Sequence, residues 1–385
     1  MALRNFDPEA LLQKWDEKKY SPLHNGKNLA QSLREAFGIP KSDTYVYRAL
    51  AETTLDITQR AIDAKRAHGL HGWYHDDEGN PIDPPHPTPS EITSYTTLFD
   101  PSLSLPKALT SFRANAPKAS LRLPISTHLS SLFFHQTPST QTTVTQTPQP
   151  QPLPLLPSKK PRTHKNPYLD LWTYSCHELE YAGPLPSTSK TRISHHILPL
   201  FYHHFGCIVP SYAALHVIAK LAQPAKPSKQ PVKPILDIGS GTGYWTFMLR
   251  NLPMVGGTGA GRDLDVRAVD SGISEYRVTW VRDTVRMDGV RYLESVVEGG
   301  KGCVLLLVYP QATGSFTADV LRAFEGDSIV VAGTQNGNRF TGFTDMRVDE
   351  WVEKNLKAFE LTLRMPLPSF AGKDEGLFVF QRRKV

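Results

Sequence analysis

Segment 235–245 constrains the fold of this chain more than any other part of the sequence. It is an apolar run that contains one acid, Asp237, and continues through three alternate glycines at positions 239, 241 and 243. Glycine lets a strand end abruptly and lets the backbone approach a ligand closely, because no Cβ stands in the way. A helix over 242–250 would then present its positive N-terminal end to the bound molecule. The segment therefore predicts a strand, a ligand loop and a helix.

Dinucleotide-binding proteins use a related layout, G-x-G-x-x-G directly after a strand. In this chain the third glycine position of that pattern is occupied by Tyr244. Asp237 lies two residues before the first glycine, where a pyrophosphate would meet a negative charge but an ammonium group would be attracted. The motif thus favours a ligand with a cationic end, and an NAD-dependent dehydrogenase is the less favoured alternative.

The motif resembles the first strand and ligand loop of class I S-adenosylmethionine-dependent methyltransferases. Across roughly 230–385 the chain is also similar to an uncharacterised subfamily with a GxGYW first loop, through GTGYW, LLLVYP, AFEGDSIVVAG and FTGF. The resemblance implies an α/β fold with a doubly wound, mostly parallel, seven-stranded Rossmann-like sheet. It further implies S-adenosylmethionine as the cofactor and methyl transfer as the activity.

Two departures from that subfamily leave the methyl acceptor open. Positions 309–311 read Tyr-Pro-Gln where Trp-Pro-Pro is expected, and 333–335 read Gly-Thr-Gln where Gly-Glu is expected after the fifth strand. The chain also lacks Asn-Pro-Pro-Tyr, the signature of enzymes that methylate amino groups of nucleic acids and of glutamine. A protein that binds S-adenosylmethionine without transferring its methyl group, and acts as an interaction module, is the alternative function.

Acids at the ends of the first three predicted strands are the candidate cofactor ligands. Asp270 closes the apolar strand 266–270, where it would accept the ribose hydroxyls, with Asp265 as the alternative. Asp288 follows a third strand within 284–289 and would accept the adenine amino group or act as a solvated turn acid. Asp237 and the glycine loop would hold the methionine end. The cofactor-binding set is then Asp237, Gly239, Ser240, Gly241, Gly243, Asp270 and Asp288.

Candidate acceptor-side residues follow the next two predicted strands. Segments 303–310 and 328–333 are near-continuous apolar runs of strand length, typical of parallel strands that are covered on both faces. Tyr309 lies at the end of the first run, where its phenol would orient an acceptor or receive a proton. Asn336 and Arg339, in the loop after the second run, are further candidates, and a basic loop there would suit an anionic acceptor.

No metal site is predicted. Several potential ligands lie close together in sequence, but Pro199 interrupts the segment and the spacing matches no familiar zinc pattern. These residues are His195, His196, His203, His204 and Cys207. The chain has only 3 cysteines, too few and too scattered for a disulfide framework, which favours a reducing compartment.

Composition divides the chain into three expected parts. Residues 1–100 carry helix signals, including a helix capped by Asp43 that runs to about His68, and predict a helical accessory region. Residues 101–165 are rich in Pro, Ser, Thr and Gln and predict a disordered linker. Residues 166–385 hold every ligand motif and predict the methyltransferase domain, with a helix over 275–281. A fragment that starts near residue 166 is then expected to fold and to bind the cofactor.

Charge and hydropathy bound the partners and the location. The net charge of +6 is modest, so a nucleic-acid partner stays open, and the N-terminal helices or the linker are a candidate surface for a protein partner. No apolar run reaches the length of a membrane span, and the first residues do not resemble a signal peptide. We therefore expect a soluble, intracellular protein, cytoplasmic or nuclear, that makes no membrane contact.

Overall fold

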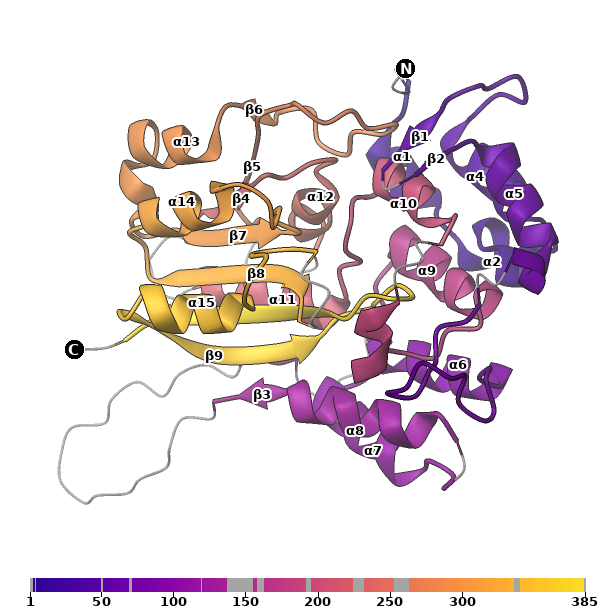
Figure 1. The fold of residues 1–385 in the computed structure, drawn as a ribbon. Coiled ribbons are helices and arrows are strands. Elements are labelled where there is room, and N and C mark those ends of the chain that lie inside the picture. The colour runs from indigo at the N-terminus through magenta and orange to yellow at the C-terminus, as the bar shows by residue number, and fades with distance from the viewer. Residues whose placement is uncertain are drawn as a thin grey trace.

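A computed structural model describes residues 3, 5–49, 51–68, 71–118, 120–136, 155–157, 163–191, 195–223, 232–252, 263–335 and 340–383. Its centre is one mixed sheet with helices on both faces, and the N-terminal helices lie beyond the carboxyl ends of its parallel strands (Figure 1). In the described part of the chain, no helix is long and apolar enough to cross a membrane.

The main sheet has 8 strands in the order β3-β9-β10-β8-β7-β4-β5-β6. Neighbouring strands from β8 through β7, β4 and β5 to β6 pair in parallel, whereas β10 is antiparallel to both β8 and β9. The strands are β3 (Phe134–His135), β4 (Ile235–Ile238), β5 (Val266–Asp270), β6 (Val285–Arg286), β7 (Val304–Val308), β8 (Ser328–Thr334), β9 (Phe359–Pro366) and β10 (Glu375–Arg382). The predicted α/β class is found, but the sheet has one strand more than the predicted seven, because β3 pairs with β9 at its edge.

Alternate residues of the central strands supply two separate hydrophobic layers, as expected for a sheet that is covered on both faces. Leu305 and Leu307 of β7 pack in the layer with α13 (Gly289–Ser295), α14 (Phe316–Ala323) and α15 (Val348–Asn355). Val304 and Leu306 pack in the other layer, which includes α11 (Tyr212–Ala222) and α12 (Tyr244–Arg250). The near-continuous apolar run of β7 follows from this burial on both faces.

The chain before the sheet is mostly helical, and its helices begin at the expected caps. Asp7 accepts a hydrogen bond from the backbone N–H of Ala10 (3.0 Å) at the start of the first helix. The α-helices are α1 (Pro8–Lys14), α2 (Glu17–Tyr20), α3 (Pro22–Asn25), α4 (Leu29–Phe37), α5 (Leu55–Asp63), α6 (Pro89–Thr96), α7 (Leu105–Ala114), α8 (Arg122–Leu132), α9 (Pro167–Glu178) and α10 (Leu198–His204). Short 3-10 turns are η1 (Lys65–His68), η2 (Thr97–Phe99), η3 (Pro186–Lys190) and η4 (Glu298–Gly300).

The predicted disordered linker is wrong over its first half. Helices α7 and α8 and strand β3 lie within 101–165, because Leu105, Leu109 and Phe112 bury one face of α7 and Ile125 and Leu129 bury one face of α8. Several Pro, Ser and Thr residues of this stretch lie at helix starts or on exposed helix faces, whereas Ser126 of α8 is buried. Positions 137–154 and 158–162 of the predicted linker lie outside the described residues.

Two predicted helices are also corrected. Asp43 caps no helix: the chain forms a hairpin of β1 (Tyr47–Arg48) and β2 (Glu52–Thr53), and α5 begins later with Thr54 as its cap. Segment 275–281 is irregular. Its backbone N–H groups bond outside the segment, with Val278 donating to the carbonyl of His203 (3.2 Å) and Trp280 to that of Thr242 (2.8 Å), so they are not available to a helical ladder.

The N-terminal region and the sheet share one hydrophobic core, which runs from Leu11 to Val379. Polar contacts also join the two parts. The Trp15 indole donates to Asp170 of α9 (2.7 Å), and His128 of α8 bonds Asp374, which lies directly before β10 (2.8 Å). These contacts argue against the expectation that a fragment starting near residue 166 folds by itself, because removing the preceding residues exposes surface that is buried in the full chain.

We predict that Trp15→Ala lowers the unfolding free energy of the whole chain by about 3–5 kcal/mol, because the buried ring leaves a cavity and Asp170 loses its donor. Denaturant unfolding, followed by circular dichroism and by fluorescence, measures the change. Leu103→Ala, at a side chain that is 41% exposed, is the control and should stay within about 0.5 kcal/mol of wild type. Two separate transitions, with only one of them shifted by Trp15→Ala, would contradict a shared core.

Candidate functional site

The candidate site lies at the carboxyl edge of the parallel strands. Strand β4 is first in sequence among the parallel strands but central in space, with β5 on one side and β7 on the other. The strand order therefore reverses at β4, and ligands of open α/β sheets bind in the crevice outside such a reversal. In Figure 1 this edge faces α10 and the N-terminal elements. The cavity at this edge is lined by Gly241 and Asp270 and also by Tyr45 from the N-terminal part of the chain.

The glycine loop after β4 has the backbone conformation that its sequence predicts. Gly239, Gly241 and Gly243 have φ angles of 76°, 58° and 78°, in the left-handed region that disfavours other residues. Space is also restricted, because a Cβ on Gly243 would lie 2.4 Å from a methyl carbon of Val281. The loop thus brings bare backbone to the crevice.

The loop amides are mostly occupied by the protein itself. Gly239 and Ser240 donate to the carbonyl of Val269 (2.8 and 3.1 Å), and Gly243 donates to that of Ser240 (2.9 Å). Gly241 donates to the Asp270 carboxylate (2.9 Å). A pyrophosphate site needs several free N–H groups that point at the ligand, so this loop is unsuited to a dinucleotide. The antiparallel β10–β9 pair at the far edge likewise differs from the parallel sixth strand of dinucleotide folds.

Asp270 joins the two loops that flank the crevice. Its Oδ2 accepts from Gly241 N–H (2.9 Å), and its Oδ1 accepts from Gly272 N–H (2.7 Å). The residue lines a cavity of about 280 Å³, and a carboxylate has about four lone-pair sites, so it can still accept hydrogen bonds from a ligand. The alternative acid, Asp265, is exposed and paired with Arg267 (2.8 Å). The structure therefore places Asp270, and not Asp265, at the cavity.

Asp237 lies beneath the loop and is fully buried. Its Oδ2 accepts from the Thr246 hydroxyl of α12 (2.7 Å), while its Oδ1 has no hydrogen-bond partner in the described part of the chain. Burial, reinforced by the nearby negative charge of Asp270, raises the pKa of Asp237 to about 7. A cation placed above the loop would relieve that cost.

The remaining predicted residues are placed differently. Asp288 is exposed and caps α13 by accepting from Arg291 N–H (3.0 Å), so the structure gives it the turn role that was the alternative to adenine binding. The Ser240 hydroxyl is buried with no hydrogen-bond partner among the described residues. Asn336 and Arg339 lie outside the described residues.

The N-terminal hairpin supplies a wall of the site that the sequence did not predict. Tyr45 lines both the cavity beside Asp270 and an adjoining groove of about 670 Å³, and the two spaces also share Ser274, Glu275 and Tyr276. The Tyr45 hydroxyl bonds Nδ1 of His203 (2.9 Å), and the Tyr47 hydroxyl bonds Nε2 of His204 (3.0 Å). We call 43–49 the N-terminal strap. No local motif marks it, because its partners lie about 155 residues away.

These contacts explain the paired histidines that could suggest a metal site. His203 and His204 end α10 and hold the strap, and Cys207 lies beyond the helix. Across the ranges that the structure describes, no group of three or more His, Cys, Asp and Glu residues is arranged to hold a metal ion.

Tyr309 follows β7 at the crevice with a φ of 52°, an uncommon value for a residue other than glycine. Its hydroxyl accepts a hydrogen bond from Lys373 Nζ (3.0 Å), and the ammonium lies 3.4 Å from the centroid of the Phe340 ring. Lys373 is 4% exposed, and the neighbouring Glu375 is completely buried. Sequence reasoning missed this pair, although Lys-Asp-Glu at 373–375 stands out between apolar residues.

Burial disfavours the charged forms of both members of this pair. It lowers the pKa of Lys373 to about 8 and raises the pKa of Glu375 to about 8, and the charge of each partner opposes the shift of the other. Burial also raises the pKa of the Tyr309 phenol above its usual value.

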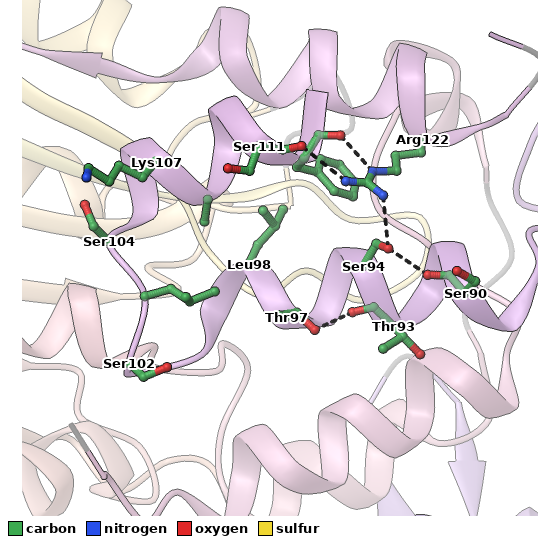
Figure 2. Close-up of a pocket in the computed structure, with 13 residues that line it drawn as sticks. Ser90, Thr93, Ser94, Thr97, Leu98, Ser102, Ser104, Lys107, Ser111 and Arg122 are labelled. Carbon is green, nitrogen blue, oxygen red and sulfur yellow. Dashed lines mark hydrogen bonds between the residues drawn. The ribbon is translucent and has the colours of Figure 1, made fainter. Parts of the chain in front are cut away.

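A further cavity of about 610 Å³ lies away from the sheet edge, between α6, α7 and α8 (Figure 2). Its lining is rich in hydroxyl groups, and several of them donate to carbonyls of their own helix, as Ser94 does to Ser90 (2.8 Å). Arg122 donates to Ser94 Oγ (3.3 Å) and to the carbonyls of Phe112 and Ser111 (2.7 and 3.3 Å). These bonds explain the polar side chains that line the cavity by their contacts within and between the helices.

Comparison with known proteins identifies no family. No protein-family profile and no curated protein matches the chain. Among solved structures it is similar to the crystal structure of an rRNA methylase from Escherichia coli, with 15% identity and a TM-score of 0.24. The match covers 39% of this chain and 57% of that chain, which is less than two thirds of the other protein. Similarity of this size carries no argument about function, so the fold class rests on the observed sheet.

We predict that Asp237→Asn stabilises the free protein at pH 8 but not at pH 4. The folded pKa of about 7 lies above the usual value of 3.8, so burying the carboxylate costs stability progressively as the pH rises from 4 through 7. The variant removes that cost, by up to about 4 kcal/mol at pH 8. Urea unfolding at both pH values measures it, with the exposed Asp265→Asn as control. A variant less stable than wild type at pH 8 would show that the carboxylate is compensated in the free protein.

Proposed function

We propose that this chain binds S-adenosylmethionine at the carboxyl edge of β4 and β5 and transfers its methyl group to an acceptor bound beside Tyr309. The observation that carries the proposal is the joint between the glycine loop and β5, where the N–H of Gly241 donates to the carboxylate of Asp270 (2.9 Å). This bond places the Asp270 carboxylate, which has spare acceptor capacity, beside the backbone of the glycine loop, and the buried Asp237 precedes that loop in β4.

The residues present fit a nucleoside with a cationic amino-acid end. Asp270 would accept the ribose hydroxyls with its remaining lone pairs. The Oδ1 atom of Asp237, which is buried and unpartnered among the described residues, would attract the methionine ammonium across the loop. The occupied amides of Gly239, Ser240, Gly241 and Gly243 suit a ligand that has no phosphate.

The protein's part in the reaction is chiefly to position the reactants. The bound cofactor supplies an electrophilic methyl group on a sulfonium. The groove of about 670 Å³ beside the N-terminal strap offers space for the acceptor, and Tyr202 and Cys207 line it on the side near Tyr309. Holding the acceptor in line with the methyl–sulfur bond removes most of the entropic part of the barrier. A protein that binds the cofactor without transfer is the alternative.

We predict that calorimetry will show binding of S-adenosylmethionine and of S-adenosylhomocysteine but not of NAD. Asp270→Asn should weaken the first two by about 10- to 100-fold, because charge-assisted hydrogen bonds contribute about 1.5–3 kcal/mol. Asp265→Asn is the matched control, since Asp265 is an exposed acid at the other end of β5. Binding of NAD with equal or higher affinity would overturn the cofactor assignment, and equal losses in the two variants would remove the role of Asp270.

Transfer is tested separately from binding. Full-length protein, incubated with methyl-labelled S-adenosylmethionine and fractionated cell extract, should place label in one fraction, and the chemistry of that fraction identifies the acceptor class. The Asp270→Asn protein, at a cofactor concentration below its dissociation constant, should label it more slowly. Tight cofactor binding without label in any fraction would favour the non-catalytic alternative.

A further inference from the structure

We propose that Lys373, reached through the hydroxyl of Tyr309, takes up the proton that the methyl acceptor must lose, so that the acceptor is an N–H or O–H nucleophile. The inference rests on the proposed function and extends it to the acceptor side. Nothing in the sequence motif or in the cofactor site requires a buried lysine at this place.

The position of Tyr309 connects the pair to the reacting centre. Tyr309 follows β7, which is the hydrogen-bonded neighbour of β4, and adjacent strands lie about 4.8 Å apart. Its backbone N–H continues the ladder by donating to the carbonyl of Ala332 (2.8 Å), which fixes the residue at the strand end. The ring is only partly buried and lies 6.0 Å, centroid to centroid, from that of Tyr202, which lines the acceptor groove.

Lys373 stands behind Tyr309 and away from solvent. Its Nζ is 3.0 Å from the Tyr309 hydroxyl oxygen, and the Phe340 ring covers it on another side. Glu375 is fully buried, with the Ser369 hydroxyl beside its carboxyl group, and Lys373 Nζ makes no hydrogen bond to it in the described ranges. A lysine that served only to neutralise this acid would be expected to bond it directly. Lys373 Nζ instead donates its side-chain hydrogen bond to the Tyr309 hydroxyl.

The step balances in protons and electrons. The acceptor's lone pair forms a bond to the methyl carbon as the carbon–sulfur bond breaks, and that electron pair stays on sulfur, which becomes a neutral thioether. The acceptor proton passes to Tyr309 Oη while the phenol proton passes to neutral Lys373 Nζ, which becomes an ammonium. Lys373 holds this proton, which returns through Tyr309 to solvent after product release.

Burial favours a neutral amine at Lys373, whereas the charges of Glu375 and Cys207 oppose that shift. Four ionisable groups face it: Tyr309 directly after β7, Glu375 at the start of β10, Cys207 in the turn after α10 and His195 before α10. Burial already lowers the pKa of Lys373 to about 8. A sulfonium cation placed one strand away repels the ammonium and lowers that pKa further, so binding of S-adenosylmethionine should expel a proton.

Proton release on binding tests this without knowledge of the acceptor. Calorimetry of S-adenosylmethionine binding to the full chain, in buffers of different ionisation enthalpy at pH 7–8.5, counts the protons released. We expect more release from wild type than from Lys373→Met or Lys373→Arg, since neither replacement side chain has an amine that deprotonates. The affinity ratio of wild type to Lys373→Met should rise with pH toward 8.5, by up to about 10-fold per pH unit. Lys354→Met, at an exposed lysine of α15, should match wild type.

The outcomes distinguish failure of the role of Lys373 from failure of the proposed function. If wild type does not bind S-adenosylmethionine, the proposed function fails, and the role of Lys373 fails with it. If wild type binds and releases the same number of protons as Lys373→Met and Lys373→Arg, only the role of Lys373 is overturned. Should Lys373→Met lose its thermal transition, the Arg variant and the wild-type pH profile decide. A proton release from the Arg variant that equals the wild-type release, or no release from wild type, refutes the proposal.

Discussion

The hydrogen bond from the N–H of Gly241 to the carboxylate of Asp270 is the contact on which the candidate site depends. It requires a left-handed backbone at Gly241, with a φ of 58°, and an acid at the last position of β5. Together these conditions hold two loops at the edge where the strand order reverses. A side chain on Gly241 would also make a tight contact with the Tyr276 hydroxyl, at 3.1 Å. The cavity beside Asp270 therefore depends both on the backbone conformation of Gly241 and on the acid at the end of β5.

Charges that are costly to bury gather around this joint. Asp237 is fully buried beneath the loop, and Lys373 and Glu375 are nearly or fully buried behind Tyr309. Native proteins seldom bury such groups without partners, since each one lowers stability unless it is paired or changes its protonation. Here the acids and the lysine have pKa values moved toward neutrality, a pattern typical of sites that bind or transfer charge. The N-terminal helices hold this arrangement in place, with His128 bonded to Asp374 between the two buried groups.

Local patterns in the sequence were enough to predict the parallel strands and to place Asp270 beside the glycine loop. The apolar runs that became β4, β7 and β8 are buried on both faces, and Asp270 lies at the cavity because it ends a strand next to the glycine loop. The strap was not predictable, because Tyr45 and Tyr47 acquire their roles from histidines about 155 residues away. Helices α7 and α8 were missed because proline and hydroxyl residues dominate a composition average, whereas the spacing of a few leucines decides burial. Asp288 was read as a ligand from its position after a strand, but its own helix uses it as a cap.

A crystal structure of the full chain with S-adenosylhomocysteine tests the central claim most directly. We predict that both ribose hydroxyls lie within hydrogen-bond distance of the Asp270 carboxylate, that the amino-acid end lies over the loop 239–243, and that the sulfur faces the Tyr309 hydroxyl. Tyr45 of the N-terminal strap should contact the ligand or close its cavity. A ligand that binds elsewhere, for example between α6 and α8, or one whose ribose makes no contact with Asp270, would contradict the account of this site.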